Sequence, residues 1–432
     1  MSSTNLKNCQ LANGEKTDIL IADGKIQDIG PTLSGDKAID IGGKLVIPGV
    51  IDAHVHFREP GGEKKEDWTS GSQAAATGGV TSVIDMPNNN PAIINKKTLG
   101  LKRDLAQKSL VNYGFYLGAT KNNHDEIKTA PNIAGVKIYV GSSTGDLLVD
   151  QDEDIAKLFS IPDIQWVIHA EDEKIITSNA KKMADVDNPA IHSEIRERKA
   201  AIKAVKRIIK LASQAGARVH ICHISTKEEI ELIKKAKENK LNITCEVSPH
   251  HLFLNRRAYK KFGNLVKVNP PLREIEDNEA LWQAINDGII DIIATDHAPH
   301  VLDEKWQDYN KVPSGIPEVQ TSLPLMMNEV SQKNISLEKL IQIMCQQPAE
   351  IFKLKNKGQI MEGYDADLTV IDQVMIKTIN KSELKSKCSW SPYEGWELKG
   401  WPIMTFVNGN LVYNNGKIND QLKGRELNYG KI

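Results

Sequence analysis

His54, His56 and Arg58 occupy alternate positions directly after the apolar segment 45–51. Side chains two residues apart on a β-strand share a face, so the two imidazoles and the guanidinium are predicted to point the same way. Burying three polar groups together is costly unless another group compensates them. Imidazole is a common metal ligand, and a divalent cation would provide that compensation. An exposed strand face is the alternative, but the apolar residues before it favour a buried metal site.

Three further potential ligands end later segments that are rich in β-branched residues. They are His169, His223 and Asp296. Enzymes built on (β/α)₈ barrels place their catalytic groups at the C-terminal ends of strands. Each side chain taken alone fits a buried structural role. Suitable groups at several strand ends of one chain favour a shared metal site.

The other histidines are interpreted differently. His220 lies near the start of a predicted strand and is expected to be structural, as are His124 and His192 in predicted loops. His250 and His251 fall within the seventh predicted strand. For these two, the sequence leaves a ligand role and a structural role open.

Lys137 is a lone cation in the otherwise apolar segment 135–140. A buried, unmodified lysine loses its charge through desolvation, so its presence there requires a reason. An exposed lysine on a strand face is one interpretation. In the other, CO₂ adds to the amine and forms an anionic carbamate that can bridge two metal ions.

The elements that must position these groups follow from the hydrophobic pattern. Apolar, β-branched segments are predicted to be strands at 45–57, 79–87, 111–119, 135–140, 164–172, 218–225, 242–252 and 291–300. The composition between them is typical of helices, most clearly at 196–217, 226–240 and 275–287. Parallel strands joined by helical crossovers predict an α/β fold closed into a (β/α)₈ TIM barrel.

Both ends of the sequence carry β-hairpin signals. Asp23-Gly24 and Asn408-Gly409 each separate two short apolar runs, as two-residue hairpin turns do. The segment 366–372 is a further predicted strand. Because each end is too small for a core of its own, we expect the two to pack together as one small β domain.

Composition excludes several classes of protein. Apolar residues make up 40% of the 432 residues, a proportion typical of globular proteins. The formal net charge of −1 gives no overall attraction to nucleic acid or to an anionic membrane, and no apolar run is long enough for a membrane span. The first residues lack a secretory signal, and the five cysteines form no CxxC pair. We therefore expect a cytoplasmic protein with reduced thiols.

Several motifs occur in order along the chain. They are Asp52-Ala-His-Val-His-Phe-Arg-Glu-Pro-Gly61, Asp85-Met-Pro-Asn88, Gly135-Val-Lys137, His169, His223, Asn269-Pro-Pro-Leu-Arg273 and Thr295-Asp-His-Ala-Pro-His300. This ordered set resembles the dihydroorotases, most closely the type I branch within the amidohydrolase superfamily. The resemblance covers almost the whole chain, including the terminal β segments and the segment 391–396.

The resemblance implies a distorted (β/α)₈ barrel with a β-sandwich made by both ends of the chain. It places the metal-dependent hydrolase barrel at residues 49–356. Residues 1–48 and 357–432 would form the two parts of the sandwich.

The same resemblance implies a set of site residues. His54, His56 and Asp296 would hold one Zn²⁺, and His169 and His223 a second, with carboxylated Lys137 and a hydroxide as bridges. Some type I relatives use an aspartate as the bridge, for which Asp146 is the weaker candidate. The substrate-binding positions carried over from the family are Arg58, Asn88 and His300 for a carboxylate and Asn269 for the ring, with Gly315 as a further substrate contact. The segment 313–320 departs from the commoner family pattern at Glu318 and Gln320.

The implied reaction is the reversible, zinc-dependent cyclisation of N-carbamoyl-L-aspartate to L-dihydroorotate and water, a step of pyrimidine (UMP) biosynthesis. Asp296 would act as the catalytic proton carrier. The expected partner is a small-molecule substrate, with no nucleic acid and no membrane. A homodimer is compatible with the resemblance, and association with a transcarbamoylase is left open.

Two other classes of function stay open at this point. Allantoinases and dihydropyrimidinases (hydantoinases) are cyclic amidohydrolases with the same metal ligands, and Asp67-Trp68 and the segment 74–79 resemble allantoinases. Arg58 favours a ring that carries a carboxylate, since those relatives usually lack this arginine. A non-catalytic scaffold is a further alternative, but such proteins typically lose metal ligands and none is missing here.

Overall fold

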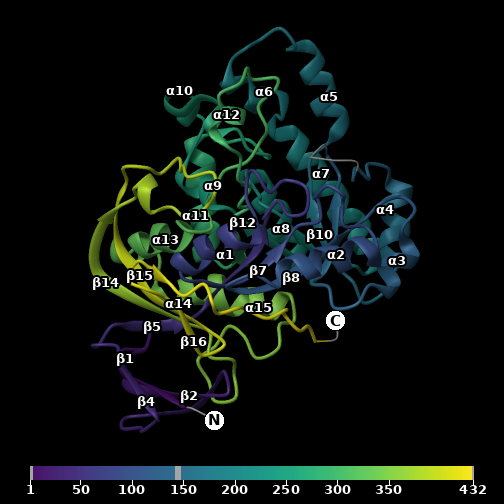
Figure 1. Cartoon of the computed structure of the whole chain (residues 1–432). Helices are drawn as coiled ribbons and strands as arrows, with labels where there is room; N and C mark the ends of the chain where they lie inside the picture. Colours follow the sequence, from purple (N-terminus) through teal and green to yellow (C-terminus); the bar gives the residue numbers. More distant parts are fainter. Residues whose placement is uncertain (1–2, 142–146, 431–432) are drawn as a thin grey trace.

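The computed structural model describes residues 3–141 and 147–430, and its largest feature is a barrel of eight parallel strands (Figure 1). Each strand is hydrogen-bonded to the next in chain order. The strands are β6 (Val50–Val55), β7 (Val80–Asp85), β8 (Asn112–Gly118), β9 (Gly135–Tyr139), β10 (Gln165–His169), β11 (Arg218–Ile221), β12 (Ile243–Val247) and β13 (Ile292–Ile293). The predicted (β/α)₈ barrel is therefore confirmed.

The barrel closes beyond its shortest strand. β13 has two residues, and the chain after it completes the ring. The backbone N–H of His56 donates to the carbonyl of His297 over 2.8 Å, and Val55 and His297 form a parallel bridge. The backbone N–H of Thr295 donates to Asp52 Oδ1 over 3.0 Å. These contacts fix the residues after β13 against the end of β6, and they make the barrel distorted.

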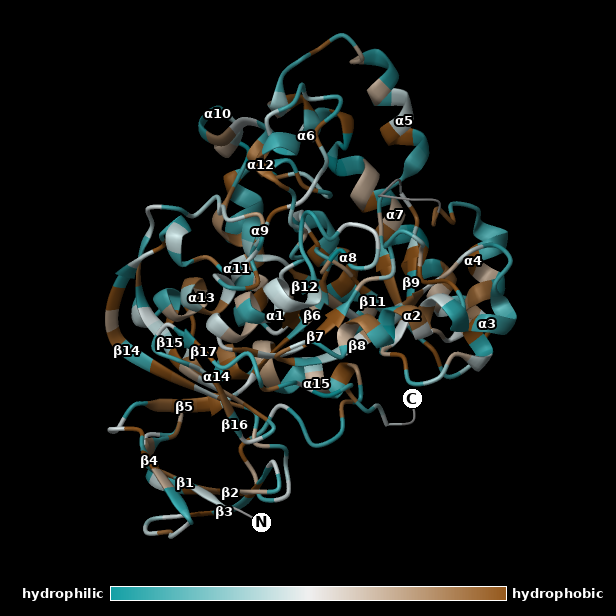
Figure 2. Cartoon of the chain, viewed as in Figure 1, coloured by the Kyte–Doolittle hydropathy of each residue, from teal (hydrophilic) through white to brown (hydrophobic). Residues whose placement is uncertain are grey.

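Helices surround the barrel, and Figure 2 shows hydrophilic and hydrophobic residues alternating along outer helices such as α5. The α-helices are α1 (Trp68–Thr77), α2 (Lys96–Ala106), α3 (His124–Thr129), α4 (Asp152–Phe159), α5 (Glu173–Lys182), α6 (His192–Ile195), α7 (Arg198–Ala215), α8 (Lys227–Glu238), α9 (Pro249–Phe253), α10 (Ala258–Phe262), α11 (Ile275–Asn286), α12 (Leu302–Lys305), α13 (Ser322–Ser331), α14 (Leu337–Ile341) and α15 (Gln347–Ile351). Short 3₁₀ turns are η1 (Pro189–Ile191), η2 (Gly263–Val266) and η4 (Lys381–Glu383), and η3 (Gln342–Gln346) is a π-helical turn.

The helix boundaries follow local signals in the sequence. Thr226 and Glu229 form the predicted capping box at the start of α8, where each side chain bonds the other residue's backbone N–H. Helix α7 ends at Gly216, which adopts the left-handed conformation at φ 65°. The three helices that were clearest from composition are confirmed as α7, α8 and α11.

Both ends of the chain form a second, nine-stranded sheet beside the barrel, where the purple and yellow segments of Figure 1 meet. Its order is β17-β16-β15-β14-β5-β1-β2-β3, and β4 also pairs with β1. The strands are β1 (Thr4–Gln10), β2 (Lys16–Ala22), β3 (Lys25–Gly30), β4 (Lys37–Asp40), β5 (Leu45–Pro48), β14 (Leu368–Thr378), β15 (Glu397–Val407), β16 (Asn410–Asn414) and β17 (Lys417–Ile418). The predicted β domain made by the two ends is confirmed.

The two predicted hairpins in this sheet are also confirmed. Asp23 and Gly24 connect β2 to β3, and Asn408 and Gly409 connect β15 to β16. All four turn residues have positive φ, between 47° and 78°, as the two-residue turns that match strand twist require.

Gly49 marks the junction of the two sheets. The segment 45–57 was predicted as one strand, but it divides here: β5 pairs with β14 in the terminal sheet and β6 with β7 in the barrel. A Cβ on Gly49 would lie 2.1 Å from Thr81 Oγ1, so the chain crosses between sheets where only glycine fits. Hydrophobicity alone could not locate the division, because both halves are buried.

Two more predicted strands are shorter than expected. β12 ends at Val247, and His250 and His251 lie on α9, where Pro249 starts a helix instead of extending the strand. The last predicted strand, 291–300, is reduced to the two residues of β13. The extended backbone cannot continue through Asp296, whose φ is 51°. Within the described residues, no helix is long and apolar enough to cross a membrane.

Candidate metal centre and substrate cavity

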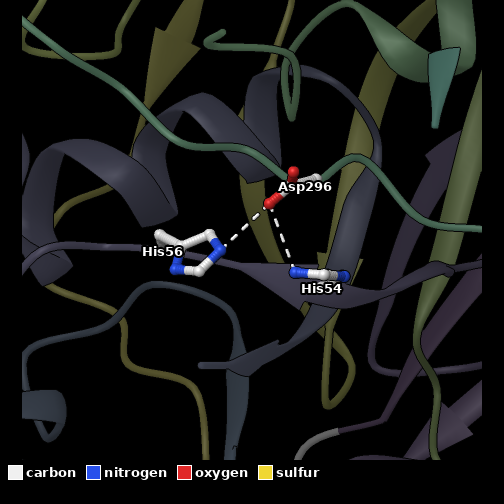
Figure 3. Close-up of side chains that lie close together, drawn as sticks. All are labelled: His54, His56 and Asp296. Atoms are coloured by element: carbon white, nitrogen blue, oxygen red, sulfur yellow. Dashed lines mark hydrogen bonds and ion pairs between the residues drawn. The ribbon is translucent and has the colours of Figure 1, made fainter. Parts of the chain in front are cut away.

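The end of β6 and the segment after β13 bring His54, His56 and Asp296 together (Figure 3). Asp296 Oδ1 lies 3.2 Å from His54 Nε2 and 3.0 Å from His56 Nε2. Both histidines are buried, with exposed fractions of 1% and 8%. The left-handed backbone of Asp296 turns its carboxylate back over the strand end. The sequence prediction that these three side chains share one location is supported by this geometry.

Each of these histidines is oriented through its other ring nitrogen. His54 Nδ1 pairs with the Glu246 carboxylate, and His56 Nδ1 lies 2.7 Å from Asn88 Oδ1. A carboxylate and an amide oxygen only accept hydrogen bonds, so each ring can donate through Nδ1 while its Nε2, directed at Asp296, would be free to bind a metal ion. Carboxylates that hold metal-binding histidines in this way are typical of metal sites.

His169 and His223 form a second pair across the barrel. His169 Nδ1 lies 3.1 Å from His223 Nε2, and both side chains are buried at the ends of neighbouring strands. His169 Nε2 lies 3.1 Å from Glu171 Oε2. Arg196 in turn pairs with Glu171 and holds the pKa of that carboxyl well below its usual range, against the opposing effect of burial.

Lys137 points into the same space from β9. Its exposed fraction is 1%, and Nζ lies 2.8 Å from Cys222 Sγ. Within residues 3–141 and 147–430, no carboxylate lies within 4 Å of Nζ. The alternative of an exposed lysine is therefore wrong. Asp146, the other candidate bridge, lies outside the described residues.

The donor atoms fit a divalent cation. Two ligands of a tetrahedral zinc at 2.0–2.1 Å lie about 3.3 Å apart, close to the 3.0–3.2 Å that separates the facing atoms here. Burial lowers the pKa of His56 to about 4 and also lowers that of His169 and His223, so these rings are neutral, as ligands must be.

The carboxylates attract positive charge to the same place. Burial opposes ionisation of Asp296, but His54 and His56 outweigh it and hold its pKa well below the usual range. Burial likewise lowers the pKa of His54, yet Glu246 and Asp296 raise it well above the usual value. The raised pKa means that His54 holds a second proton beside Asp296, and a bound cation would take the place of that proton. We name His54, His56, Lys137, His169, His223 and Asp296 the metal wall.

The metal wall lines a cavity of about 230 Å³. The five predicted substrate-binding residues line the same cavity, and we name them the carboxylate corner: Arg58, Asn88, Asn269, His300 and Gly315. Tyr139, Ala298, Pro313 and Ser314 complete the lining and were not predicted. The structure thus brings all predicted site residues to one cavity, while their roles remain predictions.

Arg58 reaches the cavity by a route that differs from the prediction. It was expected to share the strand face of His54 and His56, but β6 ends at Val55 and Arg58 has φ 62° in the following turn. The Asp85 carboxylate accepts from the backbone N–H of Phe57 over 2.6 Å and holds that turn. Arg58 Nη2 then lies 3.1 Å from His300 Nε2, and Nε donates to the carbonyl of Pro299 over 3.2 Å.

The remaining corner residues lie on loops. His300 Nδ1 lies 3.1 Å from Glu304 Oε2. Asn269 Oδ1 accepts from His192 Nε2 over 2.9 Å and from Ser314 Oγ over 3.2 Å. Gly315 has φ 147°, and a Cβ there would lie 2.3 Å from the carbonyl oxygen of Ala298, so a side chain would close this part of the cavity.

Other histidines lie outside the cavity lining. His220 Nε2 lies 3.0 Å from Glu246 Oε2, which supports its predicted structural role. His250 pairs with Glu318, and His251 with the carbonyl of Pro270. His192 and His124 lie on short helices, α6 and α3, and not in loops as predicted, since both segments form single hydrogen-bonded turns.

Sequence reasoning missed the acids behind the metal wall. Glu246 is the lone charged residue of an apolar strand, which is the same signal that singled out Lys137. Glu171 lies two residues after His169, at the end of another apolar strand. An acid buried beside a potential ligand needs a partner, and here that partner is the ligand's second nitrogen.

Comparisons with known proteins agree with this site. The Amidohydrolase family matches residues 45–412. The chain is 37% identical to a protein named dihydroorotase from Methanosphaera stadtmanae, over 95% of this chain and 96% of that protein. It is 36% identical to one of the same name from Bacillus cytotoxicus, over 92% and 94%.

Solved structures with the same fold carry a different name. The L-hydantoinase (dihydropyrimidinase) of Arthrobacter aurescens superposes with a TM-score of 0.94 at 29% identity, over 99% of this chain and 100% of that chain. A D-hydantoinase from Bacillus sp. AR9 gives a TM-score of 0.89 at 26% identity, over 96% of both chains.

Proposed function

The chain belongs to the amidohydrolase family, and from that premise we propose that it is a dihydroorotase, which interconverts N-carbamoyl-L-aspartate and L-dihydroorotate. Relatives at 36–37% identity over nearly the whole chain bear that name. The coarser statement, a cyclic amidohydrolase, also covers the hydantoinases that share the fold.

The observation that carries the narrower proposal is the position of Arg58 in the carboxylate corner. Arg58 and His300 line the same cavity as the metal wall. Dihydroorotate carries a ring carboxylate, whereas dihydrouracil and hydantoin carry none. A planar guanidinium binds a carboxylate through two parallel hydrogen bonds, so Arg58 suits the carboxylated ring.

We propose that the metal wall holds two Zn²⁺. His54, His56 and Asp296 would hold one ion, His169 and His223 the other, and Lys137 would bridge them as its carbamate. Carboxylation replaces a buried cation, which has no carboxylate partner among the described residues, with an anion among neutral imidazoles. Zinc supplies two effects when bound: it lowers the pKa of water to about 7 and it polarises a carbonyl.

The residues of the chain perform the remaining steps. In ring opening, Asp296 takes a proton from the attacking water and delivers it to the departing ring nitrogen. In ring closure the same carboxylate carries the proton in the opposite direction. Arg58, Asn88 and His300 hold the ring carboxylate, and Asn269 and Gly315 orient the ring.

The setting of the reaction belongs to the same proposal. We place it in pyrimidine biosynthesis in the cytoplasm. All five cysteines are buried free thiols, which suits a reducing compartment.

A comparison of substrates tests the function. The zinc-loaded protein is assayed with dihydroorotate, dihydrouracil, hydantoin and allantoin, and kcat/KM is measured for each. We expect turnover of dihydroorotate to exceed that of the other three. Preferential hydrolysis of hydantoin or allantoin would overturn the narrower proposal and leave a cyclic amidohydrolase of another specificity. No turnover of any of the four would favour the scaffold alternative.

A further inference from the structure

Two buried lysines lie behind the cavity wall formed by Pro313, Ser314 and Gly315. Lys305 is the last residue of α12, and its exposed fraction is 0%. Lys267 lies between η2 and Asn269, and its exposed fraction is 9%. Neither residue lines the cavity or belongs to the metal wall.

Backbone carbonyls surround the ammonium group of Lys305. Nζ donates to the carbonyls of Pro313 over 3.0 Å, Gly315 over 3.1 Å and Lys267 over 3.3 Å. Three acceptors match the three protons of an ammonium group. Across residues 3–141 and 147–430, Lys305 forms no ion pair with a carboxylate, so these carbonyls are its compensation.

Lys267 binds the preceding part of the same segment. Its Nζ donates to the carbonyls of Tyr309 over 2.8 Å and Val312 over 2.7 Å, and it lies 4.1 Å from the centre of the Tyr309 ring. The backbone of Lys267 also accepts from the N–H of Gly315 over 2.8 Å. Two ammonium groups thus hold successive parts of residues 309–315.

These contacts dictate how the peptide groups of the cavity wall are turned. In a trans peptide the C=O and N–H point in opposite directions. Because the Pro313 carbonyl faces Lys305, the N–H of Ser314 faces away from it. The Gly315 carbonyl is fixed in the same way, at a residue whose φ of 147° only glycine adopts readily.

Lys305 also lies near the loop that carries His300, whose Nε2 is 3.2 Å from the carbonyl oxygen of Ser314. Lys305 Nζ lies 6.0 Å from the centre of the Trp390 ring, and the Trp390 indole N–H donates to the His300 carbonyl over 2.7 Å. The lysine therefore lies between the two loops that carry His300 and Gly315.

We propose that Lys305 is a positioning residue for substrate binding, which fixes the backbone of Pro313–Gly315 as a wall of the carboxylate corner. It acts through these residues and does not touch the substrate. The inference rests on the proposed function, because that function assigns the corner to the ring and its carboxylate.

The matched variants are Lys305→Met and Lys357→Met. Lys357 also has a largely buried side chain, 7% exposed, but it pairs with Asp365 and Asp367 beside the terminal sheet, far along the chain from the corner. The two variants lose the same group from a buried position, so a general loss of stability affects both. Two measurements are made on each: steady-state kinetics with dihydroorotate, and hydrogen exchange of the backbone amides of residues 309–316.

For Lys305→Met we expect KM to rise roughly tenfold or more while kcat changes less than about threefold, because the wall binds substrate without contacting the reacting atoms. Zinc content should stay at the wild-type level. Amides of 309–316 should exchange faster in this variant and at the wild-type rate in Lys357→Met. A purely structural role would lower the active fraction, and hence kcat, without raising KM.

Two results would overturn the proposal. One is an unchanged KM together with unchanged exchange of 309–316. The other is an equal change of both quantities in the two variants. If Lys305→Met does not fold, Lys305→Gln takes its place; its two N–H donors leave at least one of the three carbonyls unpaired, so KM and the exchange of 309–316 should change in the same direction but less than in Lys305→Met, and no change in either would overturn the proposal. The exchange measurement needs no substrate, so it tests this inference separately from the proposed function. If the wild-type protein hydrolyses hydantoin instead of dihydroorotate, the proposed function is overturned. The kinetic comparison of the two variants is then made with hydantoin.

Discussion

The metal wall and the carboxylate corner line one cavity but are built differently. Most of the wall lies on barrel strands or within two residues of their ends, where parallel register sets each position: Lys137 pairs with Val167, and His169 with Tyr139. The corner lies on loops and depends on single contacts, such as Arg58 with His300 and Asn269 with His192.

Under the proposed function, this difference would separate the chemistry, on strands, from the choice of substrate, on loops. Changing the wall requires changing strands that also form the core, whereas changing the corner requires only a few loop residues. Neighbours of the same fold are named for hydantoin and dihydropyrimidine rings, while the sequence relatives are named for dihydroorotate. Variants that break one region and leave the other intact test the separation.

The largest effect is expected from Lys137→Ala, which removes the proposed bridge. Metal analysis should find close to two zinc ions per chain in the wild-type protein and fewer in the variant, and turnover should fall to near the background rate. Short carboxylic acids should restore part of the activity by occupying the place of the carbamate. Lys157→Ala on the exposed surface of α4 is the control. A fully active Lys137→Ala protein with a full complement of metal would exclude the bridge.

Asp296→Asn should have the next largest effect. The amide keeps an oxygen near His54 and His56 but cannot carry the proton. General acid–base catalysis contributes roughly 10²–10⁴-fold, and we expect a loss of kcat of about that size in both directions of the reaction. Zinc content is measured in parallel, so that loss of metal is separated from loss of the proton carrier. A loss of only a few-fold would place the proton carrier elsewhere.

Arg58→Met tests the corner alone. Hydrogen bonds to charged groups contribute about 1.5–3 kcal/mol each, so the loss of two should lower kcat/KM for dihydroorotate by about 10²–10⁴-fold. Zinc content should remain nearly unchanged, and any turnover of dihydrouracil should change little, because that ring has no carboxylate. Arg58→Lys keeps the positive charge but lacks the planar guanidinium with its two parallel donors, so it should recover only part of the loss. Equal losses on the two rings would show that Arg58 supports the structure of the site instead.

The smallest effect is expected from Glu246→Gln, behind the metal wall. Gln keeps an acceptor for His54 Nδ1 but removes the charge, and the loss of such a partner typically weakens metal affinity by about 10–100-fold. The ratio of dihydroorotate to dihydrouracil turnover at saturating zinc should not change. Glu228→Gln, at the protein surface beside Arg198, is the control. A changed ratio would mean that the two regions are coupled.

The sequence predicted the wall better than the corner's surroundings, for a physical reason. A histidine, lysine or aspartate at the end of an apolar strand stands out, because periodicity shows both the strand and its end. Lys137 stands out for a related reason, as a lone charge within an apolar segment, and Glu246 could have been found in the same way. Tyr139, Ala298 and Ser314 could not, since no pattern indicates which ordinary residues border a cavity.

Strand ends were the other weakness. Arg58 and Asp296 have left-handed backbones, held by contacts with residues far away in the sequence. Alternation of apolar residues carries no information on such contacts, so the first and last strands were extended too far. The cavity position of Arg58 was nevertheless anticipated, because a loop pinned by Asp85 returns it to the same side.

The junction at Gly49 has a consequence for synthesis on the ribosome. Val46 of β5 pairs with Val370 of β14, and at about 5–20 residues per second the second partner emerges roughly 15–65 s after the first. During that interval β5, with its apolar residues Leu45, Val46 and Ile47, lacks its neighbour β14 and offers an unpaired edge to other chains. The barrel strands that follow Gly49 are made within the same interval. β5 is thus translated before every barrel strand, yet its pairing with β14 is completed only after all of them have been made.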